Sequence, residues 1–228
     1  MTPELRDRLA AILERPHRLG MIGGELDRQL DHCQAFLEVV SEVVPGEELL
    51  GGEVVGGGVV GEPARGLDLG TGGGIPGLVL AAARPDMAWV LVDSRTSRAA
   101  EVERCVAKLG MHDRVQVVAA PAQHVAHDHK WRAQFSVAVA RSFGPPSFTA
   151  ECASGFLRPG GSLIVSEPPG ERSNGRWNAE GLAACGFGPA NWRERSQATF
   201  ALMVRSDSDH PADLPRLPPR TDRGWPTR

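Results

Sequence analysis

The segment from Asp68 to Gly77 has the residue types and spacing of a ligand-binding turn. It reads Asp-Leu-Gly-Thr-Gly-Gly-Gly-Ile-Pro-Gly and lies between a predicted strand and a predicted helix. Glycine lets the chain turn sharply and lets a ligand approach bare backbone, and a helix N-terminus offers free amide groups. The spacing differs from GxGxxG, and the Gly-Lys-Ser/Thr ending of a P-loop is missing. Dinucleotide and nucleoside triphosphate sites are therefore weaker interpretations, and a plain glycine turn is the alternative to any site.

A second acidic residue, Asp93, ends the next predicted strand, 25 positions after Asp68. An acidic side chain at this point binds ribose hydroxyls in Rossmann-type nucleotide sites. A solvated carboxylate at a strand end is the alternative. Because Asp93 follows the glycine-rich segment at a fitting interval, we favour a ribose-binding role.

Alternating strands and helices between residues 64 and 167 must position these side chains. The predicted strands are Gly66–Leu69, Ala88–Val92, Val115–Ala119, Phe135–Ala140 and Ser162–Ser166, and the predicted helices are Pro76–Ala83, Thr96–Leu109 and Ser147–Leu157. This alternation predicts a parallel sheet covered on both faces by right-handed crossovers. A helix near Ala179–Cys185 and an antiparallel hairpin of Asn191–Arg195 with Thr199–Arg205 are expected to follow.

Three parts of the chain are distinguished by composition. Residues 1–62 are predicted to form a helical cap with an acidic, glycine-rich connector, residues 63–205 the ligand-binding domain, and residues 206–228 a disordered tail. In the cap, Thr2 is predicted to begin a helix that has Pro3 at its first position. Apolar residues spaced by three and four predict a second helix from Glu25 to Val44.

Overall composition excludes several classes of protein. With 41% apolar residues and a net charge of −3, the chain is neither disordered nor basic in the manner usual for nucleic-acid-binding proteins. Four cysteines without a CxxC pair predict a reduced, cytoplasmic chain, and His124, His127 and His129 are interpreted as a solvated cluster rather than a metal site. We expect no signal peptide and no membrane span, which needs ~20 apolar residues.

The combined pattern predicts an α/β fold of the Rossmann-like class I methyltransferase type, with a mostly parallel sheet and a C-terminal antiparallel hairpin. The pattern consists of five alternating strands, a glycine-rich first turn, an acidic residue after the second strand and a closing hairpin. An enzyme that uses NAD would more often continue with a sixth parallel strand. The predicted cofactor is therefore S-adenosylmethionine.

Several segments also resemble the GidB/RsmG family of small-subunit ribosomal RNA guanine-N7 methyltransferases. They are Asp68–Gly77, Arg84-Pro85-Asp86, Leu91-Val92-Asp93-Ser94 with Arg98, and Ala140-Arg141-Ser142-Phe143. The resemblance covers residues 18 to 167, and the combination of motifs is specific. It implies S-adenosylmethionine as cofactor and ribosomal RNA or the small ribosomal subunit as partner, without metal or membrane.

By this resemblance, Gly70 and Ile75 line the methionine and ribose part of the cofactor, and Ala122 and Gln123 border its adenine. Arg141 completes the pocket near the substrate, which Arg98 helps to position. N7 of guanine carries a lone pair and no proton, so alignment can replace a general base, and no catalytic residue is assigned. The full predicted cofactor-binding set is Asp68, Gly70, Thr71, Gly72, Gly74, Ile75, Asp93, Ser94, Ala122, Gln123 and Arg141.

The sequence departs from the family pattern at positions expected to face the substrate. The family usually has an Arg at Pro121, an acidic residue at Gln123 and Lys-Gly at Glu167-Pro168, and its His-x-x-Asp pattern appears as Gln29-Leu30-Asp31-His32. A Glu in place of a Lys near a phosphate-rich ligand is expected to repel it. Two alternatives therefore stay open, namely a diverged methyltransferase that acts on a small molecule and a cofactor-binding or RNA-binding protein without catalysis.

Overall fold

Five parallel strands and a C-terminal antiparallel hairpin form one seven-stranded sheet. The computed structural model describes residues 1–46, 63–168, 175–196, 198–206, 213–216 and 224–225. The strand order is β3-β2-β1-β4-β5-β7-β6, with β1 to β5 parallel and β7 antiparallel to both β5 and β6. The order turns back between β1 and β4, as in doubly wound folds whose ligands bind at the carboxyl ends of the strands.

The observed elements agree closely with those expected. The strands are β1 Arg65–Leu69, β2 Ala88–Asp93, β3 Val115–Ala119, β4 Phe135–Ala140, β5 Leu157–Ser166, β6 Asn191–Arg195 and β7 Ala198–Val204. The helices are α1 Pro3–Arg18, α2 Leu26–Val43, α3 Gly77–Ala83, α4 Thr96–Leu109, α5 Ala122–Val125, α6 Pro146–Phe156 and α7 Ala179–Ala184. Thr2 accepts a hydrogen bond from the Leu5 amide, which confirms the predicted helix cap.

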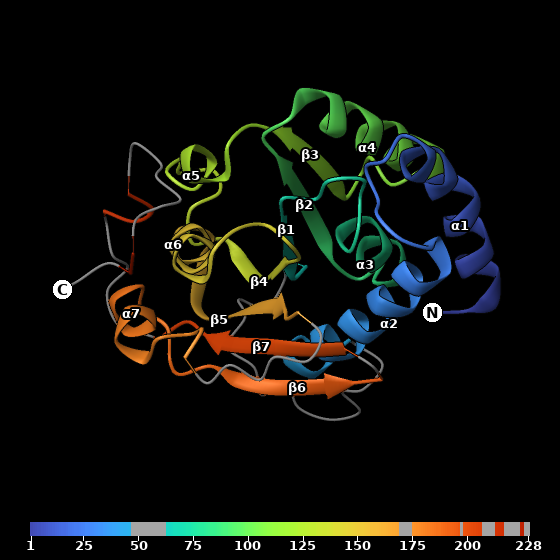
Figure 1. Ribbon diagram of the computed structural model, residues 1–228. Helices are drawn as coiled ribbons and strands as arrows, with labels where there is room; N and C mark the ends of the chain where they lie inside the picture. Colours follow the sequence, from blue (N-terminus) through green and yellow to red (C-terminus); the bar gives the residue numbers. More distant parts are fainter. Residues whose placement is uncertain (47–62, 169–174, 197, 207–212, 217–223, 226–228) are drawn as a thin grey trace.

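Helices cover both faces of the sheet and create two apolar layers. Figure 1 shows α1 to α4 toward one side of the molecule and α5 to α7 toward the other. In the first layer, Leu13 and Phe36 of the N-terminal helices join one buried cluster with Leu78, Ile164 and Phe200. The predicted helical cap is therefore packed onto the sheet rather than held apart from it. The predicted boundaries at residues 62 and 205 stay predictions, and residues 47–62 of the connector lie outside the described residues.

Two local expectations were wrong. Helix α5 was not expected, because its four residues are too few to show helical periodicity. The fifth strand was expected to begin at Ser162, whereas β5 starts at Leu157 and includes Gly160. The pairing of β5 with β4 shifts in register between Phe135 and Val137. The strand therefore contains an irregular stretch there and continues beyond it.

The C-terminal tail also differs from the expected disorder at the residues that the structure describes. Leu214 is buried, and the Pro215 carbonyl lies 2.7 Å from His127 Nε2. Arg216 forms an ion pair with Glu151 of α6. Composition did not reveal this packing, because the segment is held by a single apolar side chain and a single ion pair. Their contacts are with residues that are distant in the sequence. The remaining tail residues, 207–212, 217–223 and 226–228, lie outside the described residues.

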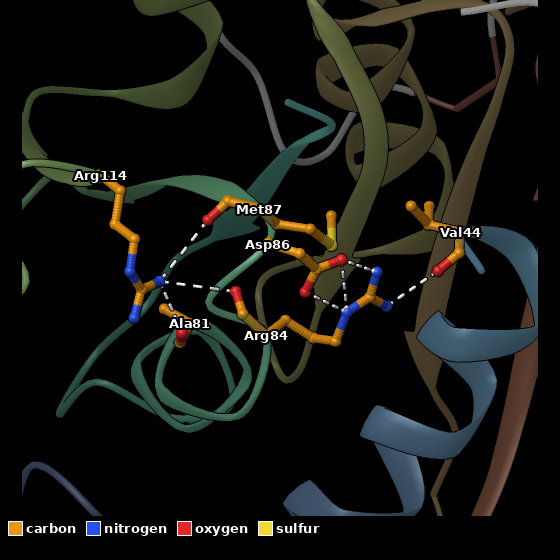
Figure 2. Close-up of polar contacts among 6 residues, drawn as sticks. All are labelled: Val44, Ala81, Arg84, Asp86, Met87 and Arg114. Carbon is orange, nitrogen blue, oxygen red and sulfur yellow. Dashed lines mark hydrogen bonds and ion pairs between the residues drawn. The ribbon is translucent and has the colours of Figure 1, made fainter. Parts of the chain in front are cut away.

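An arginine clamp joins the end of α2 to the turn between α3 and β2. Arg84 is 7% exposed; its side chain forms an ion pair with Asp86 at 2.6 Å and donates a hydrogen bond to the Val44 carbonyl at 2.8 Å (Figure 2). Arg114 donates to the Ala81 carbonyl at 2.7 Å, near the end of α3. The guanidinium groups thus satisfy carbonyl groups that helix ends leave without a partner. We assign the Arg84-Pro85-Asp86 motif a structural role on this basis.

Replacing Arg84 with Ala should lower the free energy of unfolding by about 2 kcal/mol or more, because the change leaves the Val44 carbonyl and Asp86 without their charged donor. Urea denaturation monitored by circular dichroism measures this loss. The matched control is Arg18→Ala, since Arg18 is 71% exposed and lies 3.9 Å from Glu14; it should cost less than about 1 kcal/mol. Equal losses in the two variants would contradict the clamp.

Candidate functional site

Three predicted binding segments meet at the carboxyl edge of the sheet. Strands β1, β2 and β3 are parallel neighbours, so the residues that follow them lie along one edge. Residues 70–74 follow β1, Asp93 ends β2 and Ser94 follows it, and residues 122–123 begin α5 after β3. Ala122 and Gln123 are 5% and 7% exposed, and Ser94 is exposed. The structure thus brings together residues predicted from segments more than 50 positions apart.

The glycine-rich turn is tied to the end of β2. Gly70, Gly72 and Gly74 have φ values of +73°, +57° and +101°, which glycine adopts without steric cost. The amides of Gly70 and Thr71 both donate to the Val92 carbonyl at 2.9 Å. The Gly72 amide donates to Asp93 Oδ2, also at 2.9 Å. These bonds fix the turn against the neighbouring strand before any ligand binds.

Asp93 retains the capacity to bind a ribose. Its Oδ1 accepts a hydrogen bond from the Arg95 amide at 2.8 Å, and Arg98 Nη1 lies 4.0 Å from Oδ2. A carboxylate has about four lone-pair positions, and the amides of Gly72 and Arg95 occupy two of them. Two positions remain for a pair of hydroxyls. Arg98, which was expected to position the substrate, thus lies beside the Asp93 carboxylate, which is predicted to bind the cofactor.

Asp68 lies beneath the glycine-rich turn rather than at its surface. It is 1% exposed, and its Oδ2 accepts a hydrogen bond from the Gly77 amide at 2.9 Å. Burial raises the pKa of Asp68 to about 6, although the nearby Thr71 hydroxyl and the Gly77 amide favour the charged form. Asp68 Oδ1 and the Thr71 hydroxyl are buried without a hydrogen bond to the described residues. Direct cofactor binding by Asp68 stays a prediction, and its position favours a supporting role.

Gly77 is a required residue to which the sequence analysis gave no role of its own. A Cβ atom at this position would lie 2.5 Å from the side chain of Asp68 and 2.5 Å from that of Leu91. Such contacts are too short, so α3 approaches β1 and β2 this closely only with glycine here. The last glycine of a Rossmann fingerprint has the same packing role, and its place at the start of a predicted helix was the available signal.

Protein groups cover much of the glycine-rich turn. A Cβ at Gly70 would lie 2.7 Å from Phe143 Cδ2, and one at Gly73 would lie 2.5 Å from Ile22 Cγ1. Ile75, predicted to line the cofactor, is 5% exposed and belongs to the apolar cluster with Leu78. The glycine run therefore accommodates neighbouring side chains as well as a ligand, which the sequence pattern did not distinguish.

Helix α2 brings two unexpected residues to the same edge of the sheet. Arg141, which follows β4, donates a hydrogen bond to Gln29 Oε1. Ser166, at the end of β5, lies 2.9 Å from His32 Nε2. Desolvation, together with the nearby Arg141, lowers the pKa of His32 to about 4, so the imidazole is neutral at physiological pH. The altered Gln29-Leu30-Asp31-His32 motif was the only sequence signal for these contacts.

A pocket of about 610 Å³ lies between α2 and the ends of β4 and β5. Its lining includes Arg28, Gln29 and His32 from α2, and Arg141, Glu167 and Arg176 from the segments that face them. Phe143, two residues beyond Arg141, packs against Gly70. The pocket is therefore a neighbour of the glycine-rich turn, on the side of β4.

Glu167, whose charge was expected to repel a phosphate-rich ligand, lies in the pocket wall next to an arginine. Its side chain is fully buried, and Oε1 accepts a hydrogen bond from the Trp177 indole at 2.9 Å. Oε2 lies 3.5 Å from Nη1 of Arg176, an ion pair without a hydrogen bond, and accepts no hydrogen bond elsewhere among the described residues. The negative charge is therefore opposed by a neighbouring arginine, which weakens the repulsion of an RNA ligand that was expected from a Glu at this position.

Other candidate chemistry is not assembled in the described part of the chain. No group of three potential metal ligands occurs there, and His127 contacts the tail instead. All four cysteines are free and buried, and burial raises the pKa of each thiol. Within the same residues, no helix is long and apolar enough to cross a membrane.

Asp68 and His32 should make the stability of the protein depend on pH in opposite directions. With its raised pKa, native Asp68 keeps a proton that the unfolded chain loses between about pH 4 and 6, so its contribution to stability falls as pH rises. The unfolded chain protonates His32 below about pH 6.5, whereas the native chain resists this until about pH 4, so stability falls as pH falls.

As pH rises from about 4 to about 7, the free energy of unfolding of Asp68→Asn should therefore increase relative to that of the parent protein. The total increase should be at most about 3 kcal/mol. His32→Gln should change in the opposite direction over the same range. Urea denaturation of both variants at several pH values measures the difference. Parallel pH profiles for the parent and both variants would disprove this assignment.

Comparisons with known proteins identify the family. A family model described as "rRNA small subunit methyltransferase G" matches residues 55–179, which is more than half of the chain. A ribosomal RNA small subunit methyltransferase G from Frankia casuarinae is 31% identical over 200 residues, covering 82% of this chain and 67% of that protein. Its counterpart from Moorella thermoacetica is 28% identical over 160 residues, covering 68% and 66%.

The chain spans less than two thirds of several curated relatives, for example 42% of one from Prochlorococcus marinus. Among solved structures, a predicted O-methyltransferase from Agrobacterium tumefaciens aligns with a TM-score of 0.51 at 19% identity, covering 64% of this chain and 76% of that one. This likeness supports the fold alone, and together with the sheet order it confirms the predicted Rossmann-like class I fold. On the family match, the chain belongs to the ribosomal RNA small subunit methyltransferase G family.

Proposed function

We infer that this chain is an S-adenosylmethionine-dependent methyltransferase that modifies a guanine N7 in small-subunit ribosomal RNA. The observation that carries the proposal is the glycine-rich turn held by Asp93 at the carboxyl edge of the sheet, directly beside the pocket at Arg141. Family membership supports the same acceptor, and an acceptor of this kind would place the protein in the cytoplasm.

The residues at this edge fit the proposed cofactor. When bound, S-adenosylmethionine supplies an electrophilic methyl group on sulfur. Asp93 has lone pairs for the ribose hydroxyls, and Gly70 and Gly72 of the adjoining turn are only partly buried. Ala122 and Gln123, buried at the start of α5, are placed to border the adenine. Their roles rest on this placement and on the resemblance.

The acceptor chemistry requires positioning more than proton transfer. Guanine N7 presents a lone pair without a proton, so holding the two reactants in line supplies much of the acceleration. The groups at the pocket suit that task, since Arg141 offers guanidinium donors and the neutral His32 holds the Ser166 hydroxyl. In the proposed mechanism these residues orient the base and exclude water, and none of them removes a proton.

Replacing Asp93 with Asn should weaken S-adenosylmethionine binding by about tenfold or more, because the charged acceptor for the ribose hydroxyls is lost. Isothermal titration calorimetry measures the affinity. Asp7→Asn, which alters an exposed aspartate on α1, is the control and should bind normally. Unchanged affinity in Asp93→Asn would refute the cofactor site.

The acceptor is tested by supplying labelled methyl donor with unmethylated small ribosomal subunits, with naked ribosomal RNA and with a metabolite extract in parallel. Label should enter the subunits or the RNA, and the affinity for RNA should fall steeply with ionic strength. Label confined to metabolites would overturn the RNA acceptor in favour of a small molecule, and cofactor binding without turnover on any acceptor would favour a non-catalytic role.

A further inference from the structure

The pocket between α2 and the ends of β4 and β5 has an unusual charge for this chain. Among the described residues, its lining contains three arginines and one carboxylate, although the chain as a whole carries a net charge of −3. His32 adds no charge at neutral pH because its pKa is lowered. A concave surface with an excess of one charge concentrates ligands of the opposite charge. The pocket is therefore suited to an anion.

The three arginines differ in how they are held. Arg28 is exposed and lies 3.4 Å from Glu25 on its own helix. Arg141 donates a hydrogen bond to Gln29. The Gln29 amide is uncharged, so this partner does not neutralise the positive charge of Arg141. Arg176 is 28% exposed and lies 3.5 Å from Glu167, whose side chain is fully buried. Of the three, Arg176 is thus the one fixed to a buried anchor.

The buried anchor is itself rigidly placed. Glu167 follows β5 directly, and its Oε1 accepts a hydrogen bond from Trp177, which is 5% exposed. The shortest contact with Arg176 is made by Nη1, one nitrogen of a guanidinium that carries five N–H donors. The other donors allow a second, bidentate partner, and phosphate oxygens match that geometry.

We propose that this pocket binds one nucleotide through its phosphate, with Arg176 as the phosphate-binding residue and Glu167 as its positioning residue. The volume of about 610 Å³ falls within the range of small-ligand pockets. Because β1 and β4 are neighbours with Leu69 opposite Ala140, a nucleotide bound at Arg141 lies beside the turn assigned to the cofactor. The nucleotide is part of an RNA chain if the proposed function is right, and a free nucleotide is the other source of the same chemistry.

The phosphate dependence is tested with guanosine 5′-monophosphate and guanosine as probes in isothermal titration calorimetry. The parent protein should bind the monophosphate at least about tenfold more tightly than the nucleoside. Arg176→Ala should remove most of this preference while leaving guanosine and S-adenosylmethionine affinities unchanged, and Arg176→Lys should restore part of it. An equal affinity for both probes in the parent protein would overturn the proposal.

The matched control is Arg104→Ala. Arg104 also contacts a buried glutamate, since it lies 3.0 Å from Glu101, which is 3% exposed, but it belongs to α4 and does not line the pocket. The Arg104→Ala variant should therefore keep the preference for the monophosphate over the nucleoside. Glu167→Gln keeps an acceptor for Trp177 and removes the charge that holds Arg176, so the preference should fall by a smaller factor. Loss of phosphate preference in Arg104→Ala, or an undiminished preference in Glu167→Gln, would contradict the assignments.

Methylation assays distinguish the source of the nucleotide and separate this inference from the proposed function. With ribosomal RNA as acceptor, Arg176→Ala should raise KM more than it lowers kcat and should reduce the salt slope of RNA affinity by about one. Unchanged KM and salt slope, with active enzyme, would refute the pocket assignment and leave the function standing. Arg176-dependent binding of the monophosphate without methylation of any RNA would refute the function and leave the pocket standing, with a free nucleotide as its ligand.

Discussion

The close approach of α3 to β1 is the constraint on which the rest of the site depends. It requires glycine at position 77, because any Cβ would collide with Asp68 and Leu91. The Asp68 carboxylate then accepts a hydrogen bond from the Gly77 amide. The turn between these two residues is held at the end of β2 by the hydrogen bond from the Gly72 amide to Asp93. Burying Asp68 raises its pKa, so this arrangement holds a carboxyl group against its preference for water.

Helix α2 connects the N-terminal part of the chain to the chemistry at the sheet edge. Its inner face joins the apolar core through Leu30 and Phe36, which fixes the orientation of the helix. Gln29 and His32 then reach Arg141 and Ser166 at the ends of two different strands. The helical cap is therefore part of the site rather than an appendage, and the pocket exists because α2 forms one of its walls.

The location of a charge matters more here than its count. The net charge of −3 and the Glu at position 167 both argued against an RNA ligand when the sequence was considered alone. In the structure, Glu167 is buried between Trp177 and Arg176, and among the described residues of the pocket wall three arginines face this one carboxylate. A buried carboxylate that anchors an arginine supports anion binding, whereas an exposed one would oppose it.

The sequence by itself determined the strands, most helices and the glycine-rich turn. These features depend on local periodicity and on backbone freedom, as the agreement at α4, β3, β4 and β6 shows. The four-residue α5 escaped because so short a helix has no period. Contacts such as Arg141 with Gln29 and Ser166 with His32 join residues 112 and 134 positions apart, so only tertiary packing placed them together. The pKa of His32 and the burial of Glu167 were decided in the same way, because desolvation depends on neighbours that are distant in the sequence.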